Sequence, residues 1–229
     1  MRRCRKQKRN VAAALKLRGY LIIKRIYKNC MDKNLFQNKK LILASGSPRR
    51  RELMEKLGIP FEVEVSEADE TLPDDIAAED AALYLSGIKA NAVYNLYYED
   101  HMVVIGADTV VIYDGAIYGK PKDEEDAFRM LKTLSGNTHR VITGVTVIAG
   151  DGDEEQEITF SNSSEVTFYE LSDEEIRDYI ATGEPMDKAG AYGIQDHGAL
   201  LIEHIDGDFY SVMGLPVAQL SRALTDIVS

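Results

Sequence analysis

The chain has 229 residues, of which 45% are hydrophobic and 28% charged, a length and composition that suit one substantial globular core or two small lobes. Its charge is uneven: residues 1–40 hold 14 Lys and Arg and one acid (+13), whereas the remaining 189 residues hold 13 bases and 37 acids (−24). An acidic body excludes nucleic-acid binding through an overall positive field, so any phosphate must be held by a local basic cluster.

The basic N-terminal segment has several interpretations. It could bind RNA or an anionic membrane, form a disordered tail, or be translated from upstream of a true start at Met31. Lys16 and Arg18 interrupt its apolar run, which makes it a poor signal peptide, and no stretch approaches the roughly 18 apolar residues of a membrane span. We expect a basic extension over residues 1–38 and one domain over 39–229. Both cysteines lie in the extension, which fits a reducing cytoplasm for the domain.

Residues 41–57 predict a strand, a tight turn and a helix in succession. The run 41–44 is apolar, as in a buried strand, and Ser45-Gly46-Ser47 is a turn of small residues. Ser47 is a good N-cap, and Pro48 suits the first helical position because its missing N–H costs nothing there.

This junction has the features of an anion site. Free backbone N–H groups and the positive end of a helix dipole meet there, and Arg49 and Arg50 follow in the first turn, where cations are disfavoured without a compensating anion. An arginine pair can bind phosphate oxygens with bidentate geometry. The same pattern also suits an ordinary capped helix with solvated arginines.

The next segment contains two candidate ligand groups. Residues 61–65 alternate apolar and acidic side chains, which predicts a half-buried strand, and lead into an acidic turn at 66–71. Its carboxylates could hold a divalent cation or simply be solvated. A helix is predicted from Pro73 to about Tyr97; Lys89 is its only basic residue and by itself indicates a surface position.

Asp108 lies between two apolar runs, 102–105 and 110–112, that predict strands. A buried carboxylate is costly unless it binds metal, pairs or exchanges a proton, so Asp108 is either a general base, a metal ligand or an ordinary Asp at a strand end. Asp114-Gly115 predicts a hairpin turn that would return Lys120 toward Asp108.

The second half of the chain continues the alternation of helices and strands. We expect helices from Asp123, from the capping box at Ser172, and from Leu215-Pro216; strands over 140–148, 158–160 and 163–171; and a last hairpin at Asp206-Gly207. The Gly-rich stretch 183–195 has no periodicity and predicts a loop. Its Gln195 carries a donor and an acceptor, as reading a pyrimidine edge requires.

Together these segments resemble the Maf family of nucleoside triphosphate pyrophosphatases, historically called septum-formation inhibitors. The resemblance spans residues 41–228 and rests on five motifs in the family's order. They are Ala-Ser-Gly-Ser-Pro-Arg-Arg-Arg-Glu-Leu (44–53), Gly-Ala-Asp-Thr-Val-Val (106–111), Gly-Lys-Pro (119–121), Leu-Ser-Gly-Asn-Thr-His-Arg-Val-Ile-Thr-Gly-Val (134–145) and Asp-Lys-Ala-Gly-Ala-Tyr-Gly-Ile-Gln (187–195).

The resemblance implies an α/β, two-lobed, inosine-triphosphatase-like fold, with a long central mixed β-sheet flanked by helices and an active-site cleft between the lobes. It also implies hydrolysis of the bond between the α- and β-phosphates, giving a nucleoside monophosphate and pyrophosphate. A cytoplasmic homodimer is expected from the family.

The resemblance also assigns roles to the candidate residues. Asp108 would accept the proton of the attacking water, and Glu70 with Asp108 would hold a divalent cation, Mg²⁺ or Mn²⁺. The residues that would hold the triphosphate and neutralise its charge are Ser45, Arg49, Arg50, Lys89 and Lys120.

Arg49, Thr109 and Gln195 resemble the branch of the family that acts on dTTP and UTP rather than the branch that acts on 7-methyl-GTP. A second hypothesis is a nucleotide-responsive regulator of cell division that acts by binding a partner protein. It needs the phosphate grip but not Asp108, Lys120 and Glu70 together. A nucleic-acid-binding role for the basic tail is a third hypothesis.

Overall fold

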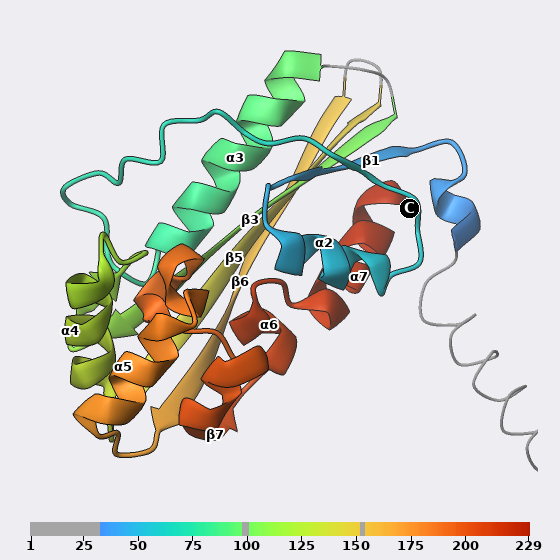
Figure 1. Cartoon of the computed structure of the whole chain (residues 1–229). Helices are drawn as coiled ribbons and strands as arrows, with labels where there is room; N and C mark the ends of the chain where they lie inside the picture. Colours follow the sequence, from blue (N-terminus) through green and yellow to red (C-terminus); the bar gives the residue numbers. More distant parts are fainter. Residues whose placement is uncertain (1–32, 98–100, 152–153) are drawn as a thin grey trace, which may run out of the picture.

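The computed structural model describes residues 33–97, 101–151 and 154–229. Helices and strands alternate along these residues, with several short 3₁₀ turns (η) between them (Figure 1). The elements are η1 (Lys33–Phe36), β1 (Lys40–Ala44), α2 (Pro48–Glu55), β2 (Glu62–Val63), α3 (Ala81–Tyr97), β3 (Met102–Tyr113), β4 (Ala116–Tyr118), α4 (Glu124–Leu134), β5 (Thr138–Asp151), β6 (Glu154–Phe168), α5 (Asp173–Ala181), η2 (Glu184–Asp187), η3 (Ala189–Ala191), η4 (Asp196–Leu201), β7 (Ile202–Asp206), α6 (Phe209–Met213) and α7 (Val217–Val228).

The strands form one mixed sheet of seven in the order β2-β1-β3-β5-β6-β7, with β4 pairing to β3 beside this path. The pairs β1–β2 and β1–β3 are parallel, and the remaining pairs are antiparallel. The α/β fold with a central mixed sheet, expected from the resemblance, is therefore confirmed.

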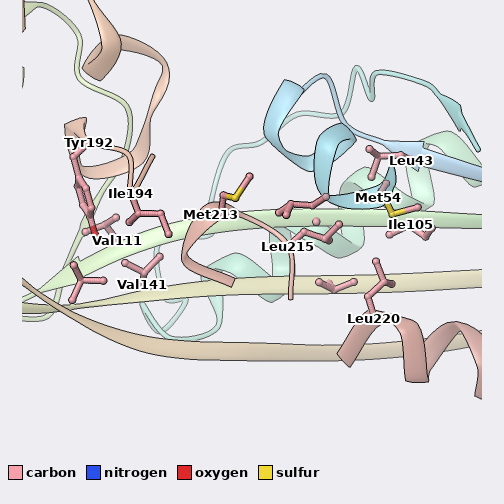
Figure 2. Packing of buried hydrophobic residues seen from close by; sticks show 14 of the residues in the cluster. Leu43, Met54, Ile105, Val111, Val141, Tyr192, Ile194, Met213, Leu215 and Leu220 are labelled. Atoms are coloured by element: carbon pink, nitrogen blue, oxygen red, sulfur yellow. The ribbon is translucent and has the colours of Figure 1, made fainter. Parts of the chain in front are cut away.

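Helices cover both faces of the sheet. Alternate residues of β1 point to opposite faces, so that Leu41 and Leu43 join the larger core while Ile42 and Ala44 pack beneath α3. Figure 1 shows α3 along one face and α2, α6 and α7 on the other. Figure 2 shows the larger core running from Leu43 at one end to Tyr192 at the other.

The sheet has a gap in one edge that positions the candidate site. β1 pairs with β3 only as far as Gly106, and β4 pairs with it only from Val111 onward. The intervening residues 107–110 have no strand neighbour on this edge among the described residues. Consecutive side chains of a strand point to opposite faces of the sheet. At this gap the consecutive residues Asp108 and Thr109 nevertheless line the same cavity.

Several predicted elements are confirmed. The strand–turn–helix unit begins its helix at Pro48 after the cap at Ser47, whose side chain accepts a hydrogen bond from the Arg50 amide. Asp123 caps α4, and Ser172 with Glu175 forms the capping box of α5. The turn at Asp114-Gly115 joins β3 to β4, and α7 follows Pro216.

Four predictions about elements are wrong. The strand predicted over 61–65 is reduced to the exposed pair Glu62–Val63, because only β1 pairs with it. The helix predicted from Pro73 begins only at Ala81, where its apolar face reaches the sheet. The strands expected over 158–160 and 163–171 are one continuous β6, since β5 pairs along its whole length. No hairpin forms at Asp206-Gly207, because β7 leads directly into α6.

Asp108 also differs from the strand-end interpretation, because β3 runs unbroken from Met102 to Tyr113. Lys89, whose position in the sequence indicated the surface, is 9% exposed and lies on the buried face of α3, whereas Leu96 is 73% exposed. Phe36, within the expected extension, is 5% exposed and belongs to the larger core.

No helix in the part of the chain that the structure describes is long and apolar enough to cross a bilayer.

Candidate active site

A cavity of about 730 Å³ lies at the gap in the sheet edge. Its walls come from six segments: the turn after β1 with the start of α2, the loop after β2, the buried face of α3, residues 108–110 of β3 with the β4 hairpin, the loop before η4, and the end of α6. All nine site residues predicted from the sequence line it: Ser45, Arg49, Arg50, Glu70, Lys89, Asp108, Thr109, Lys120 and Gln195. The sheet order thus brings together residues up to 150 positions apart (45 to 195).

Arg50 is fixed in the wall of this cavity by three protein acceptors. Its guanidinium donates to the Gly214 carbonyl at 3.0 Å, to Ser45 Oγ at 3.3 Å and to Thr109 Oγ1 at 3.1 Å. Burial lowers the pKa of Arg50 from its usual value, and the charge of Asp108 partly counters this. Since a guanidinium has five N–H donors, two remain for an anion.

A chain of hydroxyl groups continues from Arg50 through the sheet. Thr109 Oγ1 lies 2.9 Å from Thr143 Oγ1, and Thr143 donates its proton to the Ser211 carbonyl at 2.7 Å. Thr109 must therefore donate to Thr143 while it accepts from Arg50. Its hydroxyl proton is committed to the protein, and a ligand finds only a lone pair there. Thr143 and Ser211 were not predicted as site residues, because no local sequence pattern links residues 34 and 102 positions away to Thr109.

Lys89 and two carboxylates form an ionic cluster on the opposite face of β3. The Lys89 ammonium lies 2.5 Å from Asp108 Oδ1 and 2.9 Å from Glu70 Oε2. The side chains of Lys89 and Asp108 are only 11% and 13% exposed, whereas Glu70 is half exposed. A buried ammonium is tolerated because carboxylates neutralise it, which explains how α3 carries a lysine on its inner face.

The same two carboxylates fit a divalent cation. They already flank a positive charge, and Mg²⁺ in nucleotide enzymes usually takes one or two carboxylates together with substrate phosphates and water. Among the described residues there is no cluster of three or more His, Cys, Asp or Glu side chains able to hold a metal.

Five further polar side chains line the cavity, namely Arg49, Lys120, Asp187, Lys188 and Gln195. Arg49 donates to Asp187 Oδ2 at 3.2 Å, and Lys188 donates to Asp187 Oδ1 at 2.7 Å. Burial alone would raise the pKa of Asp187, but the Lys188 hydrogen bond and the charge of Arg49 outweigh it and hold that pKa below its usual value. Lys120 and Gln195 have no hydrogen-bond partner within the described ranges and are free to meet a ligand.

Comparison with known proteins gives consistent matches. Residues 40–227 match the family model described as Maf-like protein. A dTTP/UTP pyrophosphatase from Bacillus cytotoxicus is 53% identical over 186 residues, which are 81% of this chain and 94% of that protein. Two dTTP/UTP pyrophosphatases from Bacillus cereus strains AH187 and ATCC 10987 are 51% and 52% identical over 81% of this chain, and cover 94% and 89% of their own lengths.

Proposed function

The chain belongs to the Maf-like protein family, and from this premise we propose that it is a pyrophosphatase that hydrolyses dTTP and UTP to the nucleoside monophosphate and pyrophosphate. The observation that carries the proposal is the position of Asp108. It lies against an ammonium in a cavity that also presents Arg49 and Lys120, so a base and a set of phosphate-binding cations share one space. The enzyme is a hydrolase acting on acid anhydrides.

The binding residues divide between the phosphates and the base. Arg49, Lys120, Ser45 and the two remaining N–H groups of Arg50 would hold the triphosphate oxygens. Lys89 would neutralise the charge that develops as the transition state forms. Gln195 would face the pyrimidine, and the lone pair of Thr109, beside Arg50, would accept a hydrogen bond from the nucleotide.

Asp108 would act as the proton acceptor. As the oxygen of a water molecule bonds to the α-phosphorus, its proton passes to Asp108, and the bond from that phosphorus to the bridging oxygen breaks. Pyrophosphate leaves with the electron pair of the broken bond. Mg²⁺ or Mn²⁺ bound at Glu70 and Asp108 would supply positive charge to the phosphate oxygens.

The test is product analysis with each common nucleoside triphosphate and Mg²⁺ for the wild type and Asp108→Asn. We expect monophosphate and pyrophosphate from dTTP and UTP, and a loss of about 10²–10⁴-fold in turnover in the variant, the usual contribution of a positioned base. In ¹⁸O-labelled water, the label should enter the monophosphate, because attack is at the α-phosphorus.

Asp114→Asn is the matched control, since it makes the same chemical change in the exposed turn between β3 and β4, where Asn tolerates the left-handed φ of 50°. It should retain wild-type turnover. Nucleotide binding without turnover of any triphosphate would contradict the proposal and favour the regulator that acts by binding a partner protein.

We also propose that the protein is a cytoplasmic homodimer. The family resemblance supports both, and the confinement of cysteine to residues 1–30 of the sequence also fits a cytoplasmic location. Light scattering coupled to size exclusion would test the dimer, and a mass equal to one chain of 25.6 kDa would contradict it.

A further inference from the structure

The loop that carries Gln195 is closed on itself by a single carboxylate. Glu184 stands at its start, and both Glu184 oxygens accept hydrogen bonds from its end: His197 N–H donates to Oε2 at 3.2 Å and Gly198 N–H donates to Oε1 at 3.3 Å. The imidazole Nδ1 of His197 lies 3.4 Å from Oε2. The Glu184 side chain is 12% exposed, so water offers these donors little alternative.

A tyrosine extends this network to the middle of the loop. The Tyr179 hydroxyl, at the end of α5, donates to Glu184 Oε1 at 3.3 Å and accepts from the Gly193 N–H at 3.2 Å. The two limbs of the loop also touch, because a Cβ at Gly198 would lie 2.1 Å from the Gly193 carbonyl oxygen. Glu184 thus holds the chain on both sides of Gln195.

The segment between these anchors presents Gln195 to the cavity. Tyr192 and Gln195 have extended backbone angles, and consecutive residues of an extended segment point in opposite directions. Tyr192 and Ile194 are 5% and 6% exposed and point toward the core at β3 and β5 (Figure 2). Gln195 is therefore directed away from the core, and it lines the cavity.

The backbone on either side of this segment is strained. Ala191 and Asp196 adopt left-handed φ angles of 60° and 51°, which cost free energy for any residue with a Cβ. Such conformations persist where the surrounding contacts determine them, and Glu184 supplies the contacts immediately after Asp196. Without the carboxylate, the loop would relax toward less strained conformations.

We propose that Glu184 is the positioning residue that determines which pyrimidine the cavity accepts, by holding the loop 184–198 in the conformation that presents Gln195. This inference rests on the proposed function. Uracil offers a carbonyl and an N–H where cytosine offers an amino group and a ring nitrogen acceptor, and a Gln amide matches one pattern in one orientation and the other after it turns over. A loop held in one conformation limits the side-chain conformations from which Gln195 reaches the base, and so favours one of the two patterns.

The hydrogen bonds between Glu184 and the loop 184–198 are called the clamp below. The variant Glu184→Gln weakens this clamp with little change in the shape of the side chain. The substitution replaces one carboxylate oxygen by an NH₂ group, which cannot accept a hydrogen bond. The N–H and O–H groups that donated to that oxygen therefore lose their acceptor. Amide hydrogen exchange measured by NMR at Gly193, His197 and Gly198 should accelerate by at least about 10-fold, as expected when a hydrogen bond is lost. Glu203→Gln removes the same charge from an exposed side chain of β7 and should change none of these rates.

The functional readout is the ratio of kcat/KM for UTP to that for CTP. In Glu184→Gln it should fall by about 10-fold, through a higher KM for UTP and a lower KM for CTP, while kcat for UTP stays within about 3-fold. Tyr179→Phe, which removes the link to Gly193, should change the ratio in the same direction and serves if Glu184→Gln does not fold. A purely structural role would lower both nucleotides' kcat/KM equally.

Binding of UMP and CMP, measured by calorimetry, separates this inference from the proposed function. A wild type without turnover that still prefers UMP, with the preference lost in Glu184→Gln, would overturn the function and support the clamp. Faster exchange with unchanged UTP/CTP and UMP/CMP ratios would overturn the inference and leave the function intact. Unchanged exchange in Glu184→Gln would overturn the clamp itself.

Discussion

His139 is a buried imidazole in contact with the loop of the candidate site. Its ring makes edge-to-face contacts with Phe168 and Tyr192, at centroid distances of 5.0 and 5.3 Å, and its Nε2 lies 2.7 Å from the Tyr192 hydroxyl. Nδ1 is buried without a partner among the described residues. Burial lowers the pKa of His139 from 6.5 to about 4, so the ring is neutral at physiological pH.

This depressed pKa predicts a dependence of stability on pH. Between pH 6.5 and pH 4 the unfolded chain binds a proton at His139 that the folded chain does not, so lower pH favours unfolding. The contribution is fully present above pH 6.5 and is lost as the pH falls toward 4. Between pH 7 and pH 5, the free energy of unfolding should fall by about 2 kcal/mol because of this residue.

Urea unfolding at pH 5, 6 and 7 would measure this dependence. His139→Gln should be less stable at pH 7 but should lack this part of the slope, whereas His204→Gln, at an exposed position of β7, should keep it. Equal slopes in the wild type and His139→Gln would contradict the assignment.

At the level of single residues, the sequence predicted which side chains meet but not how they are committed. The nine predicted residues all line one cavity, although only some of them lie in turns: Lys89 lies within α3 and Asp108 within β3. The partners of Arg50 and the two acids beside Lys89 follow from the approach of distant elements. Glu184 and Tyr179 were missed for the same reason, since their role is visible only in the closed loop.

Two glycines allow α3 to lie directly on the sheet. A Cβ at Gly106 of β3 would lie 2.3 Å from the Ser86 carbonyl oxygen, and one at Gly144 of β5 would lie 2.4 Å from the Ala82 backbone. Gly144 pairs with Asp108 across β3 and β5, so the close approach occurs where Lys89 meets the carboxylate. The ionic cluster therefore depends on the absence of side chains in the strands.

Gly106→Ala should consequently impair stability and turnover together. The added methyl forces α3 away from β3, at a cost of about 1–3 kcal/mol for an overpacked core, and withdraws the Lys89 ammonium from Asp108. Denaturant unfolding and steady-state kinetics with dTTP would measure the two effects. We expect turnover to fall by more than the loss of folded protein accounts for.

Gly87→Ala is the control, because a Cβ at Gly87 in α3 would meet only Thr146 Oγ1, at 3.8 Å. Replacing a helical glycine there should be neutral or stabilise the protein by up to about 1 kcal/mol. A Gly106→Ala variant as active and stable as Gly87→Ala would show that α3 does not depend on the close approach.

Among the elements, helix starts with a capping residue were predicted well and strand continuity poorly. Ser47, Asp123 and Ser172 cap α2, α4 and α5 through local hydrogen bonds that a sequence can specify. The unbroken courses of β3 and β6 depend instead on pairing with β5, which supplies a partner along glycine and polar stretches that look like turns. Propensity is overridden there by tertiary contact.

For the whole molecule, the charge distribution predicted a local phosphate cluster in an acidic body. Every described residue that lines the candidate active site lies between Ala44 and Gly214. Phe36, by contrast, belongs to the larger core, and η1 contacts α7.

Deletion of residues 1–32 should leave kcat/KM for dTTP and UTP within about twofold of the full chain, because the family match begins at residue 40 and the described lining residues begin at Ala44. Phe36→Ala should instead lower the free energy of unfolding by about 3–5 kcal/mol, because it empties a core position that is 5% exposed. Steady-state kinetics and denaturant unfolding on the two variants would separate a dispensable extension from an anchored one. Loss of turnover on deletion would mean that the basic segment takes part in catalysis.

RNA affinity that disappears with residues 1–32 would assign that segment a separate nucleic-acid-binding role, since the acidic body offers no positive field for RNA.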